Sequence, residues 1–202
     1  VLAAIVIASG QRLYGNKFII FTRISLLGYA FPGAVLALGI IIPLAYIDNY
    51  IDKLFYSYFN ISTGLILSGS IFALLFAYLI RFIAIGYGAI DSGYLNINKN
   101  IDMASISLGI GKFLTIKKIH IPLLKSSILI ASIIVFVDTM KELPATLILR
   151  PFNFDTLATN VYQLASDELL EQSSLSALTI VLVGIVPLIF LTRKISNNKY
   201  FS

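Results

Sequence analysis

Long apolar runs alternate with short polar connections along the whole chain. Four mostly apolar stretches stand out, at 29–47, 64–90, 123–137 and 175–191. A helix rises 1.5 Å per residue, so crossing about 30 Å of hydrocarbon takes roughly 20 residues. The third stretch is short but extends into residues 138–140. The pattern therefore predicts four complete spans, and the apolar start at 1–9 is interpreted as the end of a truncated fifth span.

The composition agrees with lipid as the solvent. Of the 202 residues, 58% are hydrophobic and 12% are charged, and the mean hydropathy is +0.90. A soluble domain needs more polar surface than this to cover itself. We therefore predict an all-α, polytopic transmembrane helix bundle, with residues 1–202 forming one transmembrane domain that contacts membrane lipid.

The charges of the connections predict a topology. The segments 11–27 and 91–122 and the tail after 191 are rich in lysine and arginine, whereas 141–174 is acidic and 49–63 carries one acid and one lysine. Short basic loops stay in the cytoplasm. The net charge of +5 is thus interpreted as a topology signal rather than as a nucleic-acid surface. We expect an inner-membrane protein with a cytoplasmic C-terminus.

Several kinds of chemistry are excluded by what the sequence lacks. There is no cysteine and one histidine, so neither a disulfide framework nor a histidine-cluster metal centre is expected. No Gly-x-x-x-x-Gly-Lys-Ser/Thr phosphate loop is present. We predict no catalytic residue, no metal site and no cofactor, and hence not an enzyme.

The connection 101–122 is too long for a simple turn. Asp102 is a plausible N-cap of a short helix, and Gly109 can adopt the left-handed conformation that ends one. A second helical piece is predicted over 110–121, with Phe113 and His120 on related faces, and Pro122 would begin the next span. These residues alone fit an interfacial joining element and a docking site for a partner equally well.

The register of this loop resembles the signature loop of ABC importer permeases of the MetI-like type. That signature is Glu-Ala-Ala, three residues, Gly, nine residues, Ile, any residue, an apolar residue and Pro. The matching positions are Ala104, Gly109, Ile119, Ile121 and Pro122. Met103 stands where the family has Glu, and Ser105 stands for the second Ala. Asp102, one residue early, is a candidate to supply the acid.

The resemblance implies that 101–122 is a coupling loop seated in a groove of an ATP-hydrolysing subunit. Ala104, Ser105 and Gly109 would form the tight contact there. The implied partners are ATP-binding subunits, a second permease half, fused or separate, and a periplasmic substrate-binding protein. The implied mechanism is alternating access, driven by ATP on the partner subunits.

Other segments resemble the ferric-iron branch of these permeases. The run 141–158 is close to that branch's pattern, as are 28–33 and Arg81-Phe82. The chain resembles the second half of a fused permease, which makes it a fragment or one half of a longer protein. The implied cargo is ferric iron. Thiamine, sulfate or a polyamine remain alternatives, as does a membrane transporter outside the ABC class.

Ionisable residues near the outer end of the third span are candidates for the translocation path. Asp138 and Glu142 are four residues apart and would share a helix face if the helix continued. Their carboxylates suit a hard cation. The alternative is an ion-pair cluster with Lys141 and Arg150 as partners.

Three further polar features receive structural interpretations. Arg81 is expected to reach the cytoplasmic interface with its charged end. His120 is expected on the surface of the loop, because it has no histidine or cysteine partner. The acidic stretch 167–171 is expected to cap and solvate a short periplasmic helix.

Overall fold

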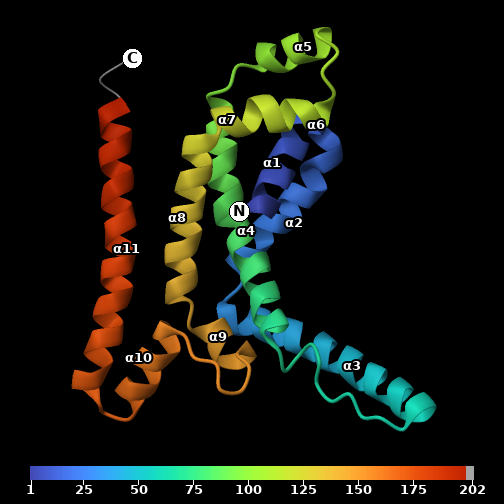
Figure 1. The fold of residues 1–202 in the computed structure, drawn as a ribbon, viewed down its shortest axis with the longest axis vertical. Coiled ribbons are helices and arrows are strands. Elements are labelled where there is room, and N and C mark those ends of the chain that lie inside the picture. Colours follow the sequence, from blue (N-terminus) through green and yellow to red (C-terminus); the bar gives the residue numbers. More distant parts are fainter. Residues whose placement is uncertain (199–202) are drawn as a thin grey trace. The chain divides into compact units, whose positions relative to one another are not determined.

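The computed structural model describes residues 1–198, and every regular element in that part is helical (Figure 1). The elements are α1 (Leu2–Tyr14), η1 (Gly15–Phe18), α2 (Ile19–Ala30), α3 (Gly33–Phe59), α4 (Ile71–Leu95), α5 (Lys99–Ser107), α6 (Lys112–Thr115), η2 (Ile116–His120), α7 (Ile121–Leu123), α8 (Lys125–Lys141), α9 (Pro144–Leu149), α10 (Leu157–Ser166) and α11 (Leu170–Asn198). The predicted all-α class is confirmed.

Three helices are long and apolar enough to cross a membrane: α3, α4 and the part of α11 from Leu170 to Ile189. A fourth crossing is formed if the segment Lys112–Leu123 and α8 are taken together, although the two are bent by 76°. The four predicted spans therefore correspond to helices. Their bounds differ from the prediction, because helices continue through polar residues that the sequence suggested were loops.

The first connection is the largest such difference. The prediction placed a basic cytoplasmic segment at 11–27, but most of it is helical. The helix α1 continues to Tyr14, η1 makes a tight turn, and α2 is a second short apolar helix. Arginine and lysine within this segment hid the apolar run from Phe18 to Leu27. The predicted connection shrinks to little more than η1.

The helix α3 also runs twelve residues past its predicted end at 47, to Phe59. Two aspartates explain the difference, because they bind the returning chain instead of facing water. The fully buried carboxylate of Asp48 accepts hydrogen bonds from the backbone N–H groups of Leu67 and Ser68, both at 2.8 Å, and from the Ser68 hydroxyl at 2.6 Å. The segment between α3 and α4 is thereby fastened along α3.

A similar contact lies one turn further along α3. The carboxylate of Asp52 accepts hydrogen bonds from the backbone N–H groups of Thr63, at 2.6 Å, and of Gly64, at 3.1 Å. Gly64 has a φ of 63°, a left-handed conformation that favours glycine. The predicted second span, 64–90, therefore begins as an irregular segment and becomes helical at Ile71.

The helices group into two compact units, each with its own apolar core. Unit 1 comprises Val1–Ala30 and Phe82–Phe136, and unit 2 comprises Phe31–Arg81 and the chain from Val137 onward. In unit 1 the buried core includes Ala4, Ala8, Ile90, Leu124 and Ala131. In unit 2 it includes Leu36, Ala37, Leu74, Ala145 and Leu149. Because the alanines are small, neighbouring helices approach closely. That residues 1–202 form a single domain remains a prediction.

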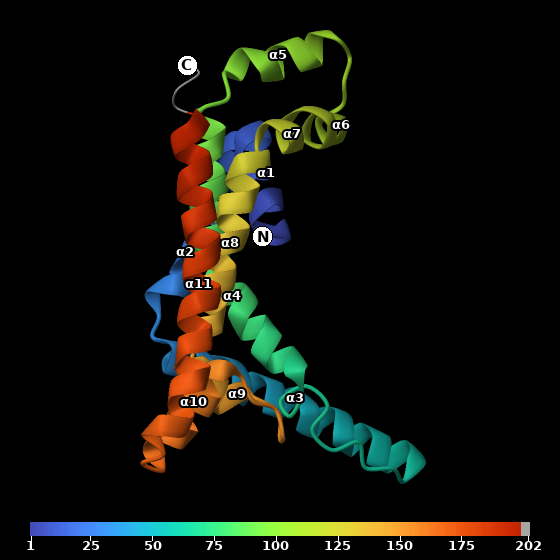
Figure 2. The same ribbon diagram turned by 60° about the vertical axis from the view of Figure 1, so that its left-hand side comes forward.

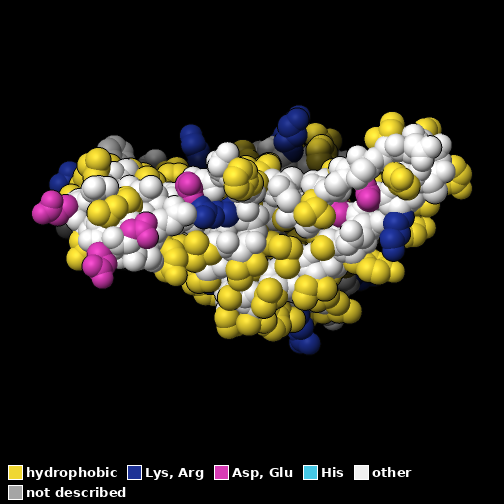
Figure 3. All heavy atoms as spheres, turned by 90° about the horizontal axis from the view of Figure 1, so that it is seen from below, with side chains coloured by type: hydrophobic (Ala, Val, Ile, Leu, Met, Phe, Trp, Pro, Cys, Tyr) yellow, Lys and Arg dark blue, Asp and Glu magenta, His cyan; other side chains and the backbone are white. Residues whose placement is uncertain are grey.

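Most large apolar side chains point outward. Only 6% of the apolar window of α11 and 17% of that of α3 is buried within the chain. The space-filling view likewise shows hydrophobic side chains across much of the face in view (Figure 3). In a membrane such faces contact lipid or other subunits. The basic tail used in the topology prediction extends to Lys199, which lies outside the described residues.

The Asp48 contacts yield a first prediction. Replacing Asp48 with Ala leaves two buried N–H groups without an acceptor, so the segment around Leu67 and Ser68 should open more easily, by about 3 kcal/mol. Hydrogen–deuterium exchange at these amides measures the effect. Asp52→Ala, one turn away and less buried, is the matched control and should affect only residues near Thr63. Unchanged protection of Leu67 and Ser68 in Asp48→Ala would contradict the assignment.

Candidate coupling site and buried ion pair

The predicted loop forms a layered element in unit 1, with α5 lying outward of α6 and α7 (Figures 1 and 2). The helix α5 begins at Lys99, after an N-cap at Asn98 whose side-chain oxygen accepts the backbone N–H of Asn100 at 2.9 Å. The prediction that Asp102 is the N-cap is therefore wrong. Asp102 lies inside the first turn of a helix that starts earlier, and its carboxylate is used elsewhere.

The end of α5 matches the prediction. Gly109 has a φ of 71°, a left-handed conformation available at low cost to glycine. The N–H of Ile110 donates to the carbonyl of Ser105 at 3.0 Å, and the N–H of Gly109 donates to that of Ile106 at 2.9 Å. This pair of bonds is the Schellman motif, which satisfies carbonyls at a helix end and turns the chain sharply.

The second helical piece is also present, as α6, η2 and α7 in succession. The segment η2 is a π-helical turn, which inserts one extra residue and rotates the following side chains relative to an α-helix. Phe113 is 76% exposed whereas His120 is fully buried. The predicted sharing of one face by these two residues is therefore wrong, and the π-helical turn is the reason. Pro122 lies in α7, two residues before the sharp bend into α8.

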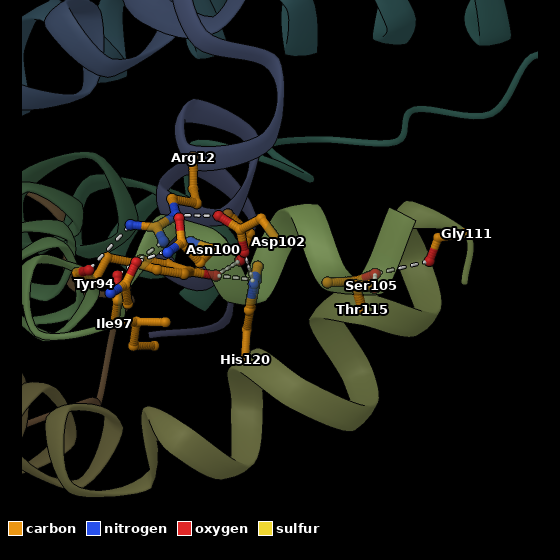
Figure 4. A network of polar contacts seen from close by, with 11 residues as sticks. Arg12, Tyr94, Ile97, Asn100, Asp102, Ser105, Gly111, Thr115 and His120 are labelled. Atoms are coloured by element: carbon orange, nitrogen blue, oxygen red, sulfur yellow. Dashed lines mark hydrogen bonds and ion pairs between the residues drawn. The ribbon is translucent and has the colours of Figure 1, made fainter. Parts of the chain in front are cut away.

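Asp102 connects three elements of unit 1 (Figure 4). One carboxylate oxygen accepts the Nε–H of Arg12, from α1, at 2.6 Å. The other lies 2.7 Å from Nε2 of His120, in η2. The Arg12 and Asp102 side chains are 11% and 15% exposed. Both carboxylate oxygens of Asp102 are therefore engaged within unit 1. The suggestion that Asp102 supplies the acid of the family's signature to a partner is corrected accordingly.

His120 continues this network into the core. Its Nδ1 lies 3.1 Å from the hydroxyl of Tyr94, on α4, and that hydroxyl lies 2.8 Å from the hydroxyl of Ser9, on α1. The rings of Tyr94 and His120 meet edge to face, with centroids 5.2 Å apart. The predicted surface position of His120 is wrong. Its partners are an aspartate and a tyrosine, which a search limited to histidine and cysteine partners overlooks.

Arg12 also closes the end of α4. Its remaining nitrogens donate to the carbonyl oxygens of Tyr94, at 3.2 Å, and Ile97, at 2.9 Å. The last carbonyls of a helix have no partner within it, and a cation there also opposes the negative end of the helix dipole. The sequence interpretation counted Arg12 only as a topology charge. Its helical spacing from Ser9 and Ala8 was the signal that it faces the core.

The outer surface of the element is apolar. Four large side chains are more than half exposed: Met103 at 66%, Ile106 at 60%, Leu108 at 76% and Phe113 at 76%. We call these four residues the apolar outer surface. The residue at the family's usual glutamate position, Met103, belongs to it. Ala104 and Gly109, two of the expected contact residues, are also exposed.

Ser105 does not belong to this surface. It is 2% exposed, and its hydroxyl lies 2.6 Å from that of Thr115 in α6. The expected tight contact through Ser105 therefore needs correction, because Ser105 joins α5 to α6. Of the remaining expected residues, Ile119 is half-buried, Ile121 is 39% exposed and Pro122 is exposed.

A buried ion pair in unit 2 joins one residue before the loop 101–122 to one residue after it. Nε of Arg81, on α4, lies 2.8 Å from Oε2 of Glu142, and their side chains are 18% and 6% exposed. Arg81 also donates to the carbonyl oxygen of Phe31, at the break between α2 and α3. The expectation that Arg81 reaches the cytoplasmic interface is wrong. It lies in the first half of α4, where a carboxylate neutralises it.

Glu142 is held at a second helix break. Oε1 accepts the backbone N–H of Ala145 at 3.2 Å, and a Cβ added to Gly33 would lie 2.5 Å from the same oxygen. Glycine is therefore required at position 33 for the carboxylate to approach the start of α3. Arg81 and Glu142 together join the break before α3 to the break before α9. Non-helical backbone at membrane depth needs such internal partners.

Asp138 and Glu142 have different ion-pair partners. The helix α8 ends at Lys141, and the N–H of Glu142 turns back to the carbonyl of Thr139. Asp138 pairs with Lys141 at 3.3 Å, and both are partly exposed. The predicted common face of Asp138 and Glu142 is wrong, because the helix does not continue. Of the two predicted ion-pair partners, Lys141 pairs with Asp138, whereas Arg150 pairs with Asp155.

Within residues 1–198 no group of three histidine, cysteine, aspartate or glutamate side chains is placed to hold a metal ion. The acidic stretch 167–171 lies at the junction of two helices. Asp167 follows the last residue of α10, Glu168 has a φ of 61°, and Glu171 is in the first turn of α11.

Curated proteins of similar sequence provide a further line of evidence on this chain. No protein-family model matches the chain. It is 26% identical over 172 residues, 85% of its length, to the Fe(3+)-transport system permease protein FbpB 2 of Haemophilus influenzae. It is 26% identical over 178 residues, 87% of its length, to the ferric transport system permease protein FbpB of Actinobacillus pleuropneumoniae. The predicted resemblance to ferric-iron permeases is confirmed. The chain spans 31% and 26% of the length of these relatives.

Both relatives are named as transport permeases. This agrees with the expectation of a transport subunit rather than an enzyme. Each match extends over more than four fifths of the chain, so the similarity is not confined to the loop 101–122. The loop resemblance and the whole-chain similarity therefore lead to the same class of protein.

The Arg81–Glu142 pair yields the second prediction. Glu142→Leu should lower stability by about 3–5 kcal/mol, because it leaves a buried guanidinium without its carboxylate. The double variant Arg81→Met with Glu142→Leu should recover most of the loss. Thermal unfolding of the purified protein in detergent measures both. Asp138→Asn, at a more exposed pair, is the control and should cost less than about 1 kcal/mol. A double variant no more stable than the single one would contradict a simple ion pair.

Proposed function

We propose that this chain is a membrane-spanning permease subunit of an ATP-driven importer, and that its cargo is ferric iron. The proposal includes docking of ATP-hydrolysing subunits on the loop 101–122, a second permease half, fused or separate, and a periplasmic binding protein. The C-terminus would be cytoplasmic and the mechanism alternating access. The observation that carries the proposal is an exposed apolar surface on a firmly anchored loop, in a chain similar to ferric-transport permeases.

The docking role is supported by the physical character of the loop. Large apolar side chains exposed beside lysines 99, 112, 117 and 118 are unusual on a surface that faces water alone. A helix presenting apolar anchors suits a groove in a partner. The helix α5 is fixed at its first turn by Asp102 and at its end by the Schellman motif. Such a rigid helix loses little conformational entropy on binding.

The proposal also assigns a role to the two acids near the end of α8. We infer that Glu142 and Asp138 lie beside the path rather than form a cation site within it. Glu142 is engaged by Arg81 and by the N–H of Ala145, and Asp138 by Lys141. Their carboxylates are thus already neutralised. The Arg81–Glu142 pair would instead fix the two helix breaks that shape the cavity.

The docking proposal predicts the effect of a charge on the apolar outer surface. Leu108→Glu should reduce co-purification of a phosphate-loop ATPase from native membranes by at least about tenfold, because a buried carboxylate without a partner opposes docking. Leu170→Glu is the matched control, since Leu170 is 66% exposed but lies at the start of α11, in the segment expected outside. Absence of any co-purifying ATPase with the unaltered chain would contradict the proposed class.

The cargo needs a separate experiment. Reconstituted transporter should hydrolyse ATP faster when Fe³⁺-loaded binding protein is added than when the same protein is added without iron. Several-fold stimulation is expected, because the loaded binding protein favours the ATP-hydrolysing conformation. Stimulation by a thiamine-, sulfate- or polyamine-loaded binding protein, with none by the iron-loaded one, would leave the importer class intact and exclude iron as the cargo.

A further inference from the structure

The helix α5 is held in unit 1 mainly by polar contacts. Ser105 is the only buried residue within Lys99–Ser107, so α5 gains little from apolar burial. A cavity of about 280 Å³ lies beside it, lined by residues of α1, α5 and α6. The helix is held instead by the Ser105–Thr115 hydrogen bond and by Asp102. Its position therefore depends on polar contacts of defined geometry.

Those contacts form an unbroken line from α5 to two apolar helices. The carboxylate of Asp102 contacts His120, the imidazole of His120 contacts the Tyr94 hydroxyl, and that hydroxyl contacts Ser9. Arg12 makes a second route, from Asp102 directly to α1, to the carbonyl of Tyr94 in the last turn of α4 and to that of Ile97 just beyond it. Figure 4 shows the side chains of Arg12, Tyr94, Asp102 and His120 converging between α1, α4, α5 and η2.

Low exposure makes this network stiff. His120 is fully buried, and Ser9 and Tyr94 are 1% and 3% exposed. In so dry a site a hydrogen bond is electrostatically stronger than in water, and a broken one leaves an unsatisfied polar group. A displacement of α5 that separates Asp102 from Arg12 or His120 is therefore costly. Moving α5 together with α1 and α4 costs less.

We infer that Arg12, Asp102, His120, Tyr94 and Ser9 form a polar latch that transmits movement of α5 to α1 and α4. These are positioning residues, since they lie beneath the proposed docking surface and do not belong to it. The inference rests on the proposed docking of an ATPase on α5. It assigns the route by which force applied to the loop reaches the apolar helices, and it gives Asp102 an internal role in place of an outward one.

The test separates docking from transmission. Tyr94→Phe removes one hydroxyl, the link between His120 and Ser9, and keeps the ring in place. Asp102→Asn keeps the shape of the side chain and removes the charge that holds Arg12. Tyr87→Phe is the matched control, because Tyr87 is also buried, lies two turns earlier on α4 in the same apolar cluster, and is outside the latch. All are assembled with the ATPase and the binding protein in proteoliposomes.

The readout is Fe³⁺ taken up per ATP hydrolysed, with Fe³⁺-loaded binding protein as the probe. Tyr94→Phe should retain ATPase co-purification within about twofold, because it leaves the contacts of Asp102 in place. In both latch variants, uptake per ATP should fall by about fivefold or more, a typical coupling between sites. Tyr87→Phe should leave the ratio unchanged. The melting temperature of each variant shows whether its loss of uptake comes from lower stability alone. If Asp102→Asn is destabilised, the result for Tyr94→Phe, the milder change, tests the latch.

Two outcomes would overturn the latch. An unchanged uptake per ATP in both variants would show that α5 transmits its movement without these contacts. Loss of ATPase co-purification in parallel with uptake would show that the network only shapes the docking surface. Failure of the unaltered chain to bind an ATPase is a different result, because it rejects the proposed function itself. Spatial continuity alone does not demonstrate coupling, so the ratio is the decisive measurement.

Discussion

The engagement of Asp102 by Arg12 and His120 is the constraint on which the loop element depends. It fixes the first turn of α5 against α1 and η2, while large apolar side chains of α5 remain exposed. A single carboxylate with two partners from distant parts of the chain brings three elements together. Both the apolar outer surface and the closed end of α4 follow from that arrangement.

Unit 2 also contains buried carboxylates that join separate segments of the chain. Asp48 and Glu142 are buried acids whose partners come from segments far along the chain. Each is compensated, Asp48 by backbone N–H groups and a hydroxyl, and Glu142 by a guanidinium and an N–H. Burying an unpaired charge in an apolar medium would cost several kcal/mol at least. These two acids therefore hold non-helical backbone: Asp48 binds the connection between α3 and α4, and Glu142 lies at the break between α8 and α9.

The sequence predicted the class and the loop well, and the partners of its polar residues poorly. Apolar runs of sufficient length predict spans, and the spacing from Gly109 to Pro122 predicts the loop, because both depend on local order along the chain. Helix ends at Asp48 and in 11–27 were misplaced, since a polar residue suggests a loop unless its tertiary partner is known. The rotation of His120 into the core depends on a π-helical turn, for which the sequence carries no signal of its own.

The position of Met103 bears on the kind of partner that the loop would fit. In the family pattern an acid stands at that position, and Asp102 is the nearest candidate to replace it. The structure gives the two residues different surroundings: Asp102 contacts Arg12 and His120, whereas Met103 is 66% exposed. The exposed large side chains of α5 are thus apolar, and the same loop also exposes Lys99, Lys112, Lys117 and Lys118. A partner groove that complements this chain would be apolar at its centre and acidic at its rim, because like charges across an interface are unfavourable and desolvated lysines need partners.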